Sequence, residues 1–230
     1  MGRSLDRSQK LLLAAGATSA VLWALPGFGI VTLPLVYLNT HIHELCHALA
    51  AAATGGMAER IVVNANGNGT TLTSGGWDLA ISSAGYVGAS LIGAFIIAMA
   101  RNPKGAKSVL TGLAVFLALG MALWVRGGAV GIAAGIGWVV LLLAGAYQLQ
   151  GATLLFFAQF IGVQQSLTSV LGLYILFKIN VQTGLENDAL SAQQVSGVPA
   201  LIWALLWIGI SGLGLWAGLR FAWGSNRRAG

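Results

Sequence analysis

The sequence has few charged residues and a single cysteine. Charged side chains make up 8% of its 230 residues, whereas they make up about a quarter of a typical soluble domain. The hydrophobic fraction is 57% and the mean hydropathy is +0.80. These values exclude an ordinary soluble domain and predict an integral membrane protein. One cysteine also excludes a disulfide within the chain.

The basic residues lie in short clusters between apolar runs, and the formal net charge is only +6. This pattern is typical of membrane-topology signals and of contacts with lipid headgroups. We therefore expect membrane lipids, and no nucleic acid, among the partners.

Long uncharged runs predict the transmembrane helices. Residues 79–100 and 108–125 carry no charge, and each run is long enough to cross about 30 Å of hydrocarbon. Residues 127–177 are too long for one span, and the polar break at 147–151 divides them into two. Three other spans are expected at 11–25, from Ile30 or Pro34 to about Thr54, and at 198–219. The sequence thus predicts one all-α membrane domain over residues 1–230, a bundle of about six to seven transmembrane helices.

The N-terminal segment has the basic start and apolar middle of a signal peptide. It lacks a small-residue cleavage pattern, and residues 26–29 (Pro-Gly-Phe-Gly) look like a turn between two helices. Seven full crossings would place equal numbers of Lys and Arg on both sides of the membrane, whereas a single crossing by residues 11–54 would place most of them on one side. The positive-inside rule therefore favours an incomplete early segment.

Residues 57–75 depart from the membrane pattern. β-Branched runs at 61–63 and 70–73 flank the sequence Asn-Ala-Asn-Gly-Asn-Gly, in which Asn and Gly tolerate the positive φ angles of a tight turn. We expect a short β-hairpin here. A second polar segment, at about 179–197, is expected to be a loop.

The motif His-Glu-x-x-His occupies positions 43–47 in the second apolar segment. On a helix, His43 and His47 lie one turn apart on the same face, where two imidazoles can bind one zinc ion. Glu44 would lie beside the metal without ligating it, placed to take a proton from the attacking water. The nearest charged residues in the sequence are Lys10 and Glu59. A carboxylate so isolated in an apolar segment favours a functional role.

Other polar residues of the apolar segments have plainer interpretations. His41 lies about 200° around the helix from His43, so we expect it to face away from the metal. Gln164 and Gln165 could line a water path or stabilise an oxyanion, or they could form hydrogen bonds between helices.

Catalytic zinc usually has three protein ligands, with the fourth position left for water. The remaining carboxylates suitable as the third ligand are Glu186 and Asp188, which precede the last span. The shorter side chain of Asp188 would hold a metal more rigidly, so we choose it over Glu186.

The pattern resembles the site-2 protease family of intramembrane zinc metallopeptidases. The matching features are the motif at 43–48 in an early helix, Gly55-Gly56 after it, the hairpin, and the run 84–86 (Ala-Gly-Tyr). The chain looks most like the compact bacterial branch without a PDZ domain. In that branch an Asp-Ala pair before the last span supplies the third ligand, and residues 188–189 match it. Cys46 stands where many relatives have Gly, and the Leu-Asp-Gly motif of the better-known branch is absent.

The resemblance implies a zinc-dependent endopeptidase of a bacterial cell membrane that cleaves membrane-spanning or membrane-associated proteins. The alternative is a zinc-binding membrane protein without protease activity, such as a transporter or a scaffold. A transporter would spread its ionisable residues over several spans, whereas this chain concentrates them on one helix and one polar segment.

Overall fold

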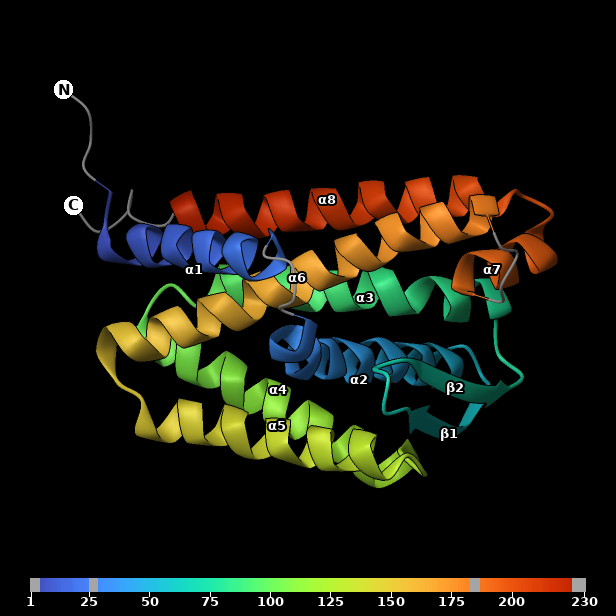
Figure 1. Ribbon diagram of the computed structural model, residues 1–230, viewed down its shortest axis with the longest axis horizontal. Helices are drawn as coiled ribbons and strands as arrows, with labels where there is room; N and C mark the ends of the chain where they lie inside the picture. Colours follow the sequence, from blue (N-terminus) through green and yellow to red (C-terminus); the bar gives the residue numbers. More distant parts are fainter. Residues whose placement is uncertain (1–4, 25–28, 183–186, 225–230) are drawn as a thin grey trace.

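The computed structural model describes residues 5–24, 29–182 and 187–224. Over these residues the chain forms eight helices and one two-stranded sheet (Figure 1). Long apolar segments favour helix because a helix satisfies its own backbone hydrogen bonds, which lipid cannot do. This fold confirms the predicted class, a helical membrane bundle with a short hairpin.

The helices keep close to the predicted segments. Their bounds are α1 Arg7–Ala24, α2 Gly29–Ala53, α3 Asp78–Met99, α4 Pro103–Trp124, α5 Ala129–Gln148, α6 Gly151–Gln182, α7 Asp188–Ser196 and α8 Ala200–Gly224. The break between α5 and α6 lies within the predicted polar stretch at 147–151. Pro34 lies inside α2 and does not begin it. The turn predicted at 26–29 lies mostly outside the described residues.

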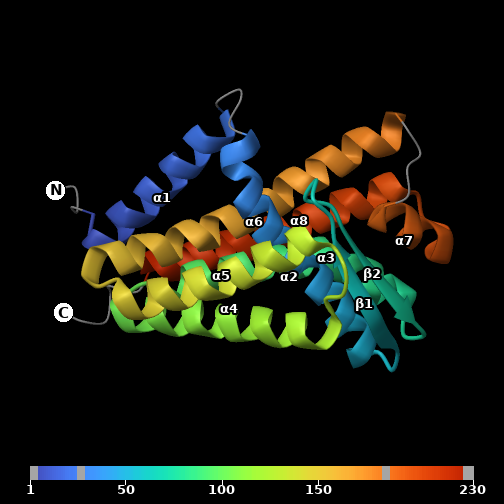
Figure 2. The ribbon, with the colours of Figure 1, turned by 60° about the horizontal axis from the view of Figure 1, so that its bottom comes forward.

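Five of these helices are long and apolar enough to cross a membrane, namely α3, α4, α5, residues 151–173 of α6, and α8. The early helices α1 and α2 are not among them. In α2, the polar residues between positions 39 and 47 lower its hydropathy. Helices α1 and α2 together pass once from one end of the molecule to the other (Figures 1 and 2). This path agrees with the expectation that one early segment is incomplete.

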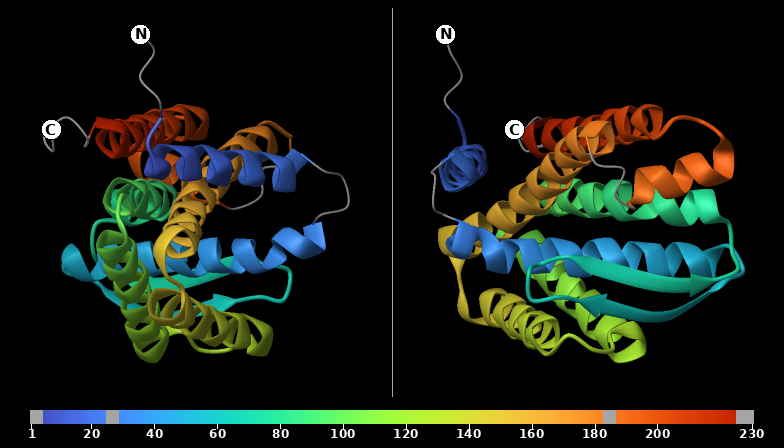
Figure 3. Two further views of the ribbon diagram at one scale, coloured as in Figure 1. Left: turned by 90° about the vertical axis from the view of Figure 1, so that its left-hand side faces the viewer. Right: turned by 45° about the vertical axis from the view of Figure 1, so that its right-hand side comes forward.

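The core of the bundle surrounds α2. Its fully buried residues Leu38, Ile42 and Leu45 join a cluster that includes side chains of α4, α5 and α6 and of strand β1. Helix α3 packs along another side of α2, and the hairpin covers a further side (Figure 3). Protein thus encloses the motif helix on several sides. Polar groups that would be unfavourable in lipid can be accommodated in such surroundings.

The hairpin consists of β1, Met57–Val63, and β2, Gly69–Ser74, paired antiparallel with a bulge between Ala58 and Arg60. Its turn contains Gly67 at φ +87°, a conformation that glycine adopts without strain. The hairpin predicted over residues 57–75 is confirmed.

Part of the segment expected as a polar loop, residues 188–196, is instead the short helix α7. The Asn187 side chain accepts hydrogen bonds from the backbone N–H groups of Ala189 and Leu190, both at 3.1 Å, and so caps the helix. A small buried cluster attaches α7 to the bundle through α6 and α8: Leu173, Ala189, Ala192, Ala200, Ala204 and Trp207. The helix lies at the same end of the molecule as the hairpin (Figure 1).

Candidate metal centre

His43 and His47 project from the same face of α2, as their spacing predicts. Their Nε2 atoms lie 3.0 Å apart. The His43 side chain is 13% exposed and that of His47 is 8% exposed. Two imidazole nitrogens turned toward each other at this distance do not form a favourable contact unless a proton or a metal ion lies between them.

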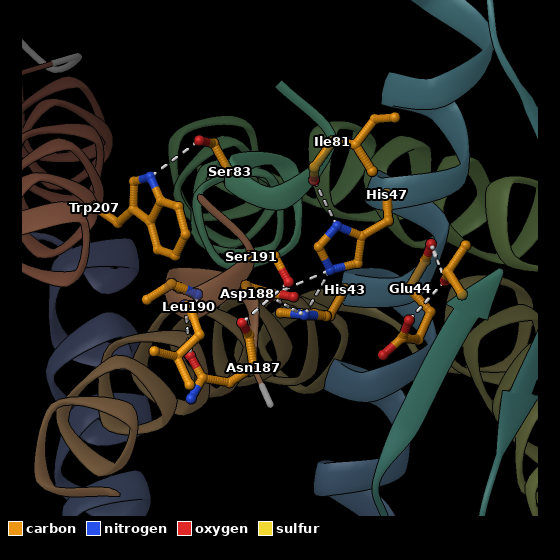
Figure 4. A network of polar contacts seen from close by, with 12 residues as sticks. His43, Glu44, His47, Ile81, Ser83, Asn187, Asp188, Leu190, Ser191 and Trp207 are labelled. Carbon is orange, nitrogen blue, oxygen red and sulfur yellow. Dashed lines mark hydrogen bonds and ion pairs between the residues drawn. The ribbon is translucent and has the colours of Figure 1, made fainter. Parts of the chain in front are cut away.

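Asp188 approaches the two imidazoles from the first turn of α7. Its Oδ2 atom lies 3.1 Å from His43 Nε2 and 3.3 Å from His47 Nε2, as Figure 4 shows. The cap at Asn187 sets the direction of this first turn, and the buried cluster at α7 holds the helix against α3, α6 and α8. The structure therefore brings together the three residues chosen from the sequence as metal ligands. The alternative ligand Glu186 lies outside the described residues.

The three donor atoms fit a zinc ion. A tetrahedral ion with ligands at about 2.0 Å separates neighbouring ligand atoms by about 3.3 Å, and the observed separations are 3.0, 3.1 and 3.3 Å. His47 Nδ1 lies 2.6 Å from the backbone oxygen of Ile81. An imidazole that donates its Nδ1 proton to this carbonyl can present an unprotonated Nε2 to a metal ion, as a ligand must. In the described part of the chain this is the group of His, Cys and acidic residues able to hold a metal.

Asp188 is suited to remain ionised at this position. Burial by itself would raise the pKa of Asp188, but the positive charge of a protonated His47 and the hydrogen bonds from His43 and His47 act in the opposite direction and hold it well below the usual range for aspartate. An ionised carboxylate is the form that binds a cation.

Gly85 of α3 packs against the open side of this group. A Cβ atom at this position would lie 2.5 Å from the Nε2 atoms of both His43 and His47. The added carbon would be equally far from the two nitrogens, as expected also for an ion that binds both. The absence of a side chain at Gly85 therefore keeps the space beside both nitrogens free.

Glu44 is buried and points toward the hairpin rather than joining the ligands. Its Oε2 accepts a hydrogen bond of 2.6 Å from the Thr71 hydroxyl of β2. Gly69 also contacts this side chain, because a Cβ added there would lie 2.5 Å from Glu44 Oε1. The carboxylate is thus held beside the three donor atoms without occupying the place of a ligand.

A polar cavity of about 550 Å³ opens in front of these residues. It lies between β2, the start of α3 and α7. Its lining residues are Glu44, His47, Gly69, Thr70, Thr71, Thr73, Asp78, Ile81, Ser82, Asn187, Asp188, Ser191, Gln194 and Val195. A peptide segment in this cavity would lie against Glu44 and against two of the three donor residues, His47 and Asp188.

An aromatic wall supports the back of His43. The ring of Tyr86 meets the His43 ring edge-on at 4.5 Å, and it stacks on Trp207 at 6.3 Å. Trp207 in turn donates from Nε1 to the Ser83 hydroxyl at 3.1 Å. These contacts restrict the orientation of the imidazole and exclude water from one side of it.

The other polar residues singled out in the apolar segments take structural positions. His41 does not join the donor group; its Nδ1 lies 2.7 Å from the Tyr37 carbonyl oxygen. Gln165 donates to Asn39 Oδ1 at 2.9 Å and Gln164 accepts from Trp23 Nε1 at 2.8 Å. These are hydrogen bonds between helices, the plainer of the two interpretations of the glutamines.

Cys46 packs in the core, 8% exposed, against Gly88 of α3, where an added Cβ would lie 2.7 Å from the Cys46 sulfur. Asp78 begins α3, as expected for an acid at a helix N-terminus, and it also lines the cavity. Sequence reasoning missed the contact of Thr71 with Glu44. The threonine run indicates a strand, but nothing in it indicates which threonine faces the carboxylate.

Comparison with known proteins identifies the family of the chain. The family model described as peptidase M50B-like matches residues 12–218, and no PDZ domain is matched. No curated protein and no solved structure matches the chain. The matched region includes the motif helix, the hairpin, Gly85 and Asp188, and it covers most of the chain. The chain therefore belongs to the peptidase M50B-like family, a branch of the site-2 proteases, which are membrane-embedded metallopeptidases.

Proposed function

We propose that this chain, acting as one polytopic domain, is a zinc-dependent endopeptidase that hydrolyses peptide bonds of membrane-spanning or membrane-associated proteins. The observation that supports it best is the convergence of His43, His47 and Asp188 within 3.3 Å of one another, with Glu44 held beside them. Membership of the family supports the same activity. The membrane of a bacterial cell is the location we propose, with lipids around the spans.

The proposed ligands of the ion are His43, His47 and Asp188. A zinc ion held there would supply Lewis acidity, which polarises the scissile carbonyl and makes water more acidic. The protein's own contribution is the geometry. The Ile81 carbonyl fixes the His47 tautomer, the cap at Asn187 directs Asp188 toward the imidazoles, and Gly85 leaves the space open.

Glu44 is the proposed general base and acid. Its carboxylate would accept a proton from the attacking water and deliver it to the nitrogen of the departing amine, so that no net proton is gained or lost. Because the side chain is buried and anchored, little reorganisation is needed when the reaction begins.

The substrate must be extended when it reaches the site, because a helical peptide hides its amides in internal hydrogen bonds. Strand β2 provides an edge for such a segment. In the described part of the chain β2 pairs with β1 alone. The other edge of β1 is occupied at Ile61, where Arg126 N donates to the Ile61 carbonyl at 2.8 Å. We infer that substrate adds to the free edge of β2, which lines the cavity.

A single variant tests the proposed function. Glu44→Gln keeps the shape of the side chain but cannot accept the proton, so cleavage of single-span model peptides in proteoliposomes should fall by about 10²- to 10⁴-fold. Zinc content, measured by mass spectrometry of the purified protein, should remain at one ion per chain. Equal cleavage by wild type and variant would contradict the proposal. A wild type that binds zinc and cleaves no peptide in a broad panel would favour the non-proteolytic alternative.

A further inference from the structure

The side of α2 that faces the hairpin forms three hydrogen bonds with it at regular helical spacing. Tyr37 donates from its hydroxyl to the Ala65 carbonyl at 2.6 Å, and Thr40 donates to the Gly67 carbonyl at 2.6 Å. One turn further along, Glu44 accepts from Thr71. Positions 37, 40 and 44 lie on one face of a helix. The hairpin is therefore fixed along α2, from its turn to the middle of β2.

The third of these contacts differs from the other two because its acceptor is a side-chain carboxylate. The Thr71 Oγ1 atom lies 2.6 Å from Glu44 Oε2 and 3.1 Å from the backbone oxygen of the same residue. A hydroxyl has one proton, and the shorter distance assigns it to the carboxylate. A hydrogen bond to a charged acceptor is among the stronger ones in proteins.

The carboxylate is held from a second direction by the backbone at Gly69. A Cβ there would lie 2.6 Å from Glu44 Cγ and 2.5 Å from Oε1, so no side chain longer than hydrogen fits without moving Glu44. Gly69, Thr71 and Thr73 share the face of β2 that is partly buried, whereas Thr70 and Leu72 are exposed. Two residues of this one face thus define the position of Glu44.

We propose that Thr71 is a positioning residue for the reaction, and that its hydroxyl holds Oε2 of Glu44 so that Oε1 receives and returns the proton. This inference rests on the proposed function. The strand that would align the scissile bond is then the same strand that fixes the base, so the relative placement of base and substrate depends on one short segment. Such placement matters because a displacement of about 1 Å at a reacting group can lower the rate by about 10²-fold.

The test compares three variants by zinc content, melting temperature, kcat and KM on single-span model peptides. Thr71→Val replaces the hydroxyl with a methyl group of similar size, and Thr71→Ser keeps the hydroxyl. Thr111→Val, in α4 and outside the site cavity, is the matched control. We expect Thr71→Val to lower kcat by about 10- to 100-fold, with unchanged zinc and KM. Thr71→Ser should retain most of the activity, and Thr111→Val should behave as wild type.

Several results would overturn the inference. One is a Thr71→Val enzyme with wild-type kcat. Another is an equal decrease of kcat in Thr71→Val and Thr71→Ser. A third is a lower zinc content or a lower melting temperature of Thr71→Val, which would make the role of Thr71 structural. Glu44→Gln measured in parallel separates this inference from the proposed function. If Glu44→Gln cleaves as well as wild type, the proposed function itself fails. If Glu44→Gln is inactive and Thr71→Val is fully active, only the role of Thr71 is refuted.

Discussion

The substitution Gly85→Ala tests whether the space beside the two imidazoles is required for the metal. The added methyl carbon would lie 2.5 Å from His43 Nε2 and His47 Nε2, whereas ordinary contacts of a Cβ atom begin at 3.4 Å. The imidazoles, or α3 itself, would have to move by about 0.9 Å to restore such a contact. Metal–ligand distances tolerate a change of only about 0.2 Å.

Loss of a hydrogen bond to a metal ligand typically weakens metal binding by about 10- to 100-fold. We expect Gly85→Ala to weaken zinc binding by more than this. The fold itself should not be weakened by backbone effects, because alanine favours a helix over glycine by about 0.5–1 kcal/mol. Gly112→Ala in α4 is the matched control, since a Cβ there would meet no atom within 4 Å. That control should bind zinc as wild type does.

Zinc affinity would be measured by competition with a chromophoric chelator, and zinc content by mass spectrometry. Cleavage of the model peptides should fall in proportion to the zinc lost. If Gly85→Ala binds one zinc ion per chain with wild-type affinity, the ion does not occupy the space beside Gly85, and the geometry proposed for the centre is wrong.

Two other predictions concern the third ligand and the strand. Asp188→Asn removes the negative charge from a donor whose Oδ2 atom lies 3.1 Å from His43 Nε2 and 3.3 Å from His47 Nε2. The affinity for zinc should fall by at least about tenfold. A variant with unchanged zinc affinity would show that Asp188 is not a ligand. Proline substitutions along β2 should lower the rate of cleavage while zinc stays bound, because proline removes a backbone donor from the edge of the strand. The control Glu59→Pro, in the bulge of β1, should have a smaller effect. Unchanged cleavage in every β2 variant would refute strand addition.

Hydropathy and local spacing account for most of the fold. The uncharged runs produce the spans because each apolar segment must satisfy its backbone internally in lipid. The hairpin follows from the Asn- and Gly-rich turn between β-branched runs. These signals are local, so they can be read without knowing what lies nearby in space.

Helix α7 shows the limit of such signals. Its sequence lacks the apolar periodicity that predicts a helix, although Asn187 is a typical capping residue. It is held by the buried alanines 189 and 192 against α6 and α8. A short helix of this kind is stable mainly through tertiary contacts. Its existence therefore depends on neighbours that the local sequence does not reveal.

The candidate centre likewise depends partly on local sequence and partly on packing. The four-residue spacing of His43 and His47 already determines that both imidazoles share one face, because the geometry of a helix is regular. Chemistry alone left Asp188 and Glu186 as alternatives, and the meeting of Asp188 with the imidazoles depends on how α7 packs. The positions of Gly85 and Thr71 likewise depend on how α3 and β2 pack against α2. Packing between segments distant in the sequence depends on the shapes of all the surfaces involved, so only the tertiary structure decided these contacts.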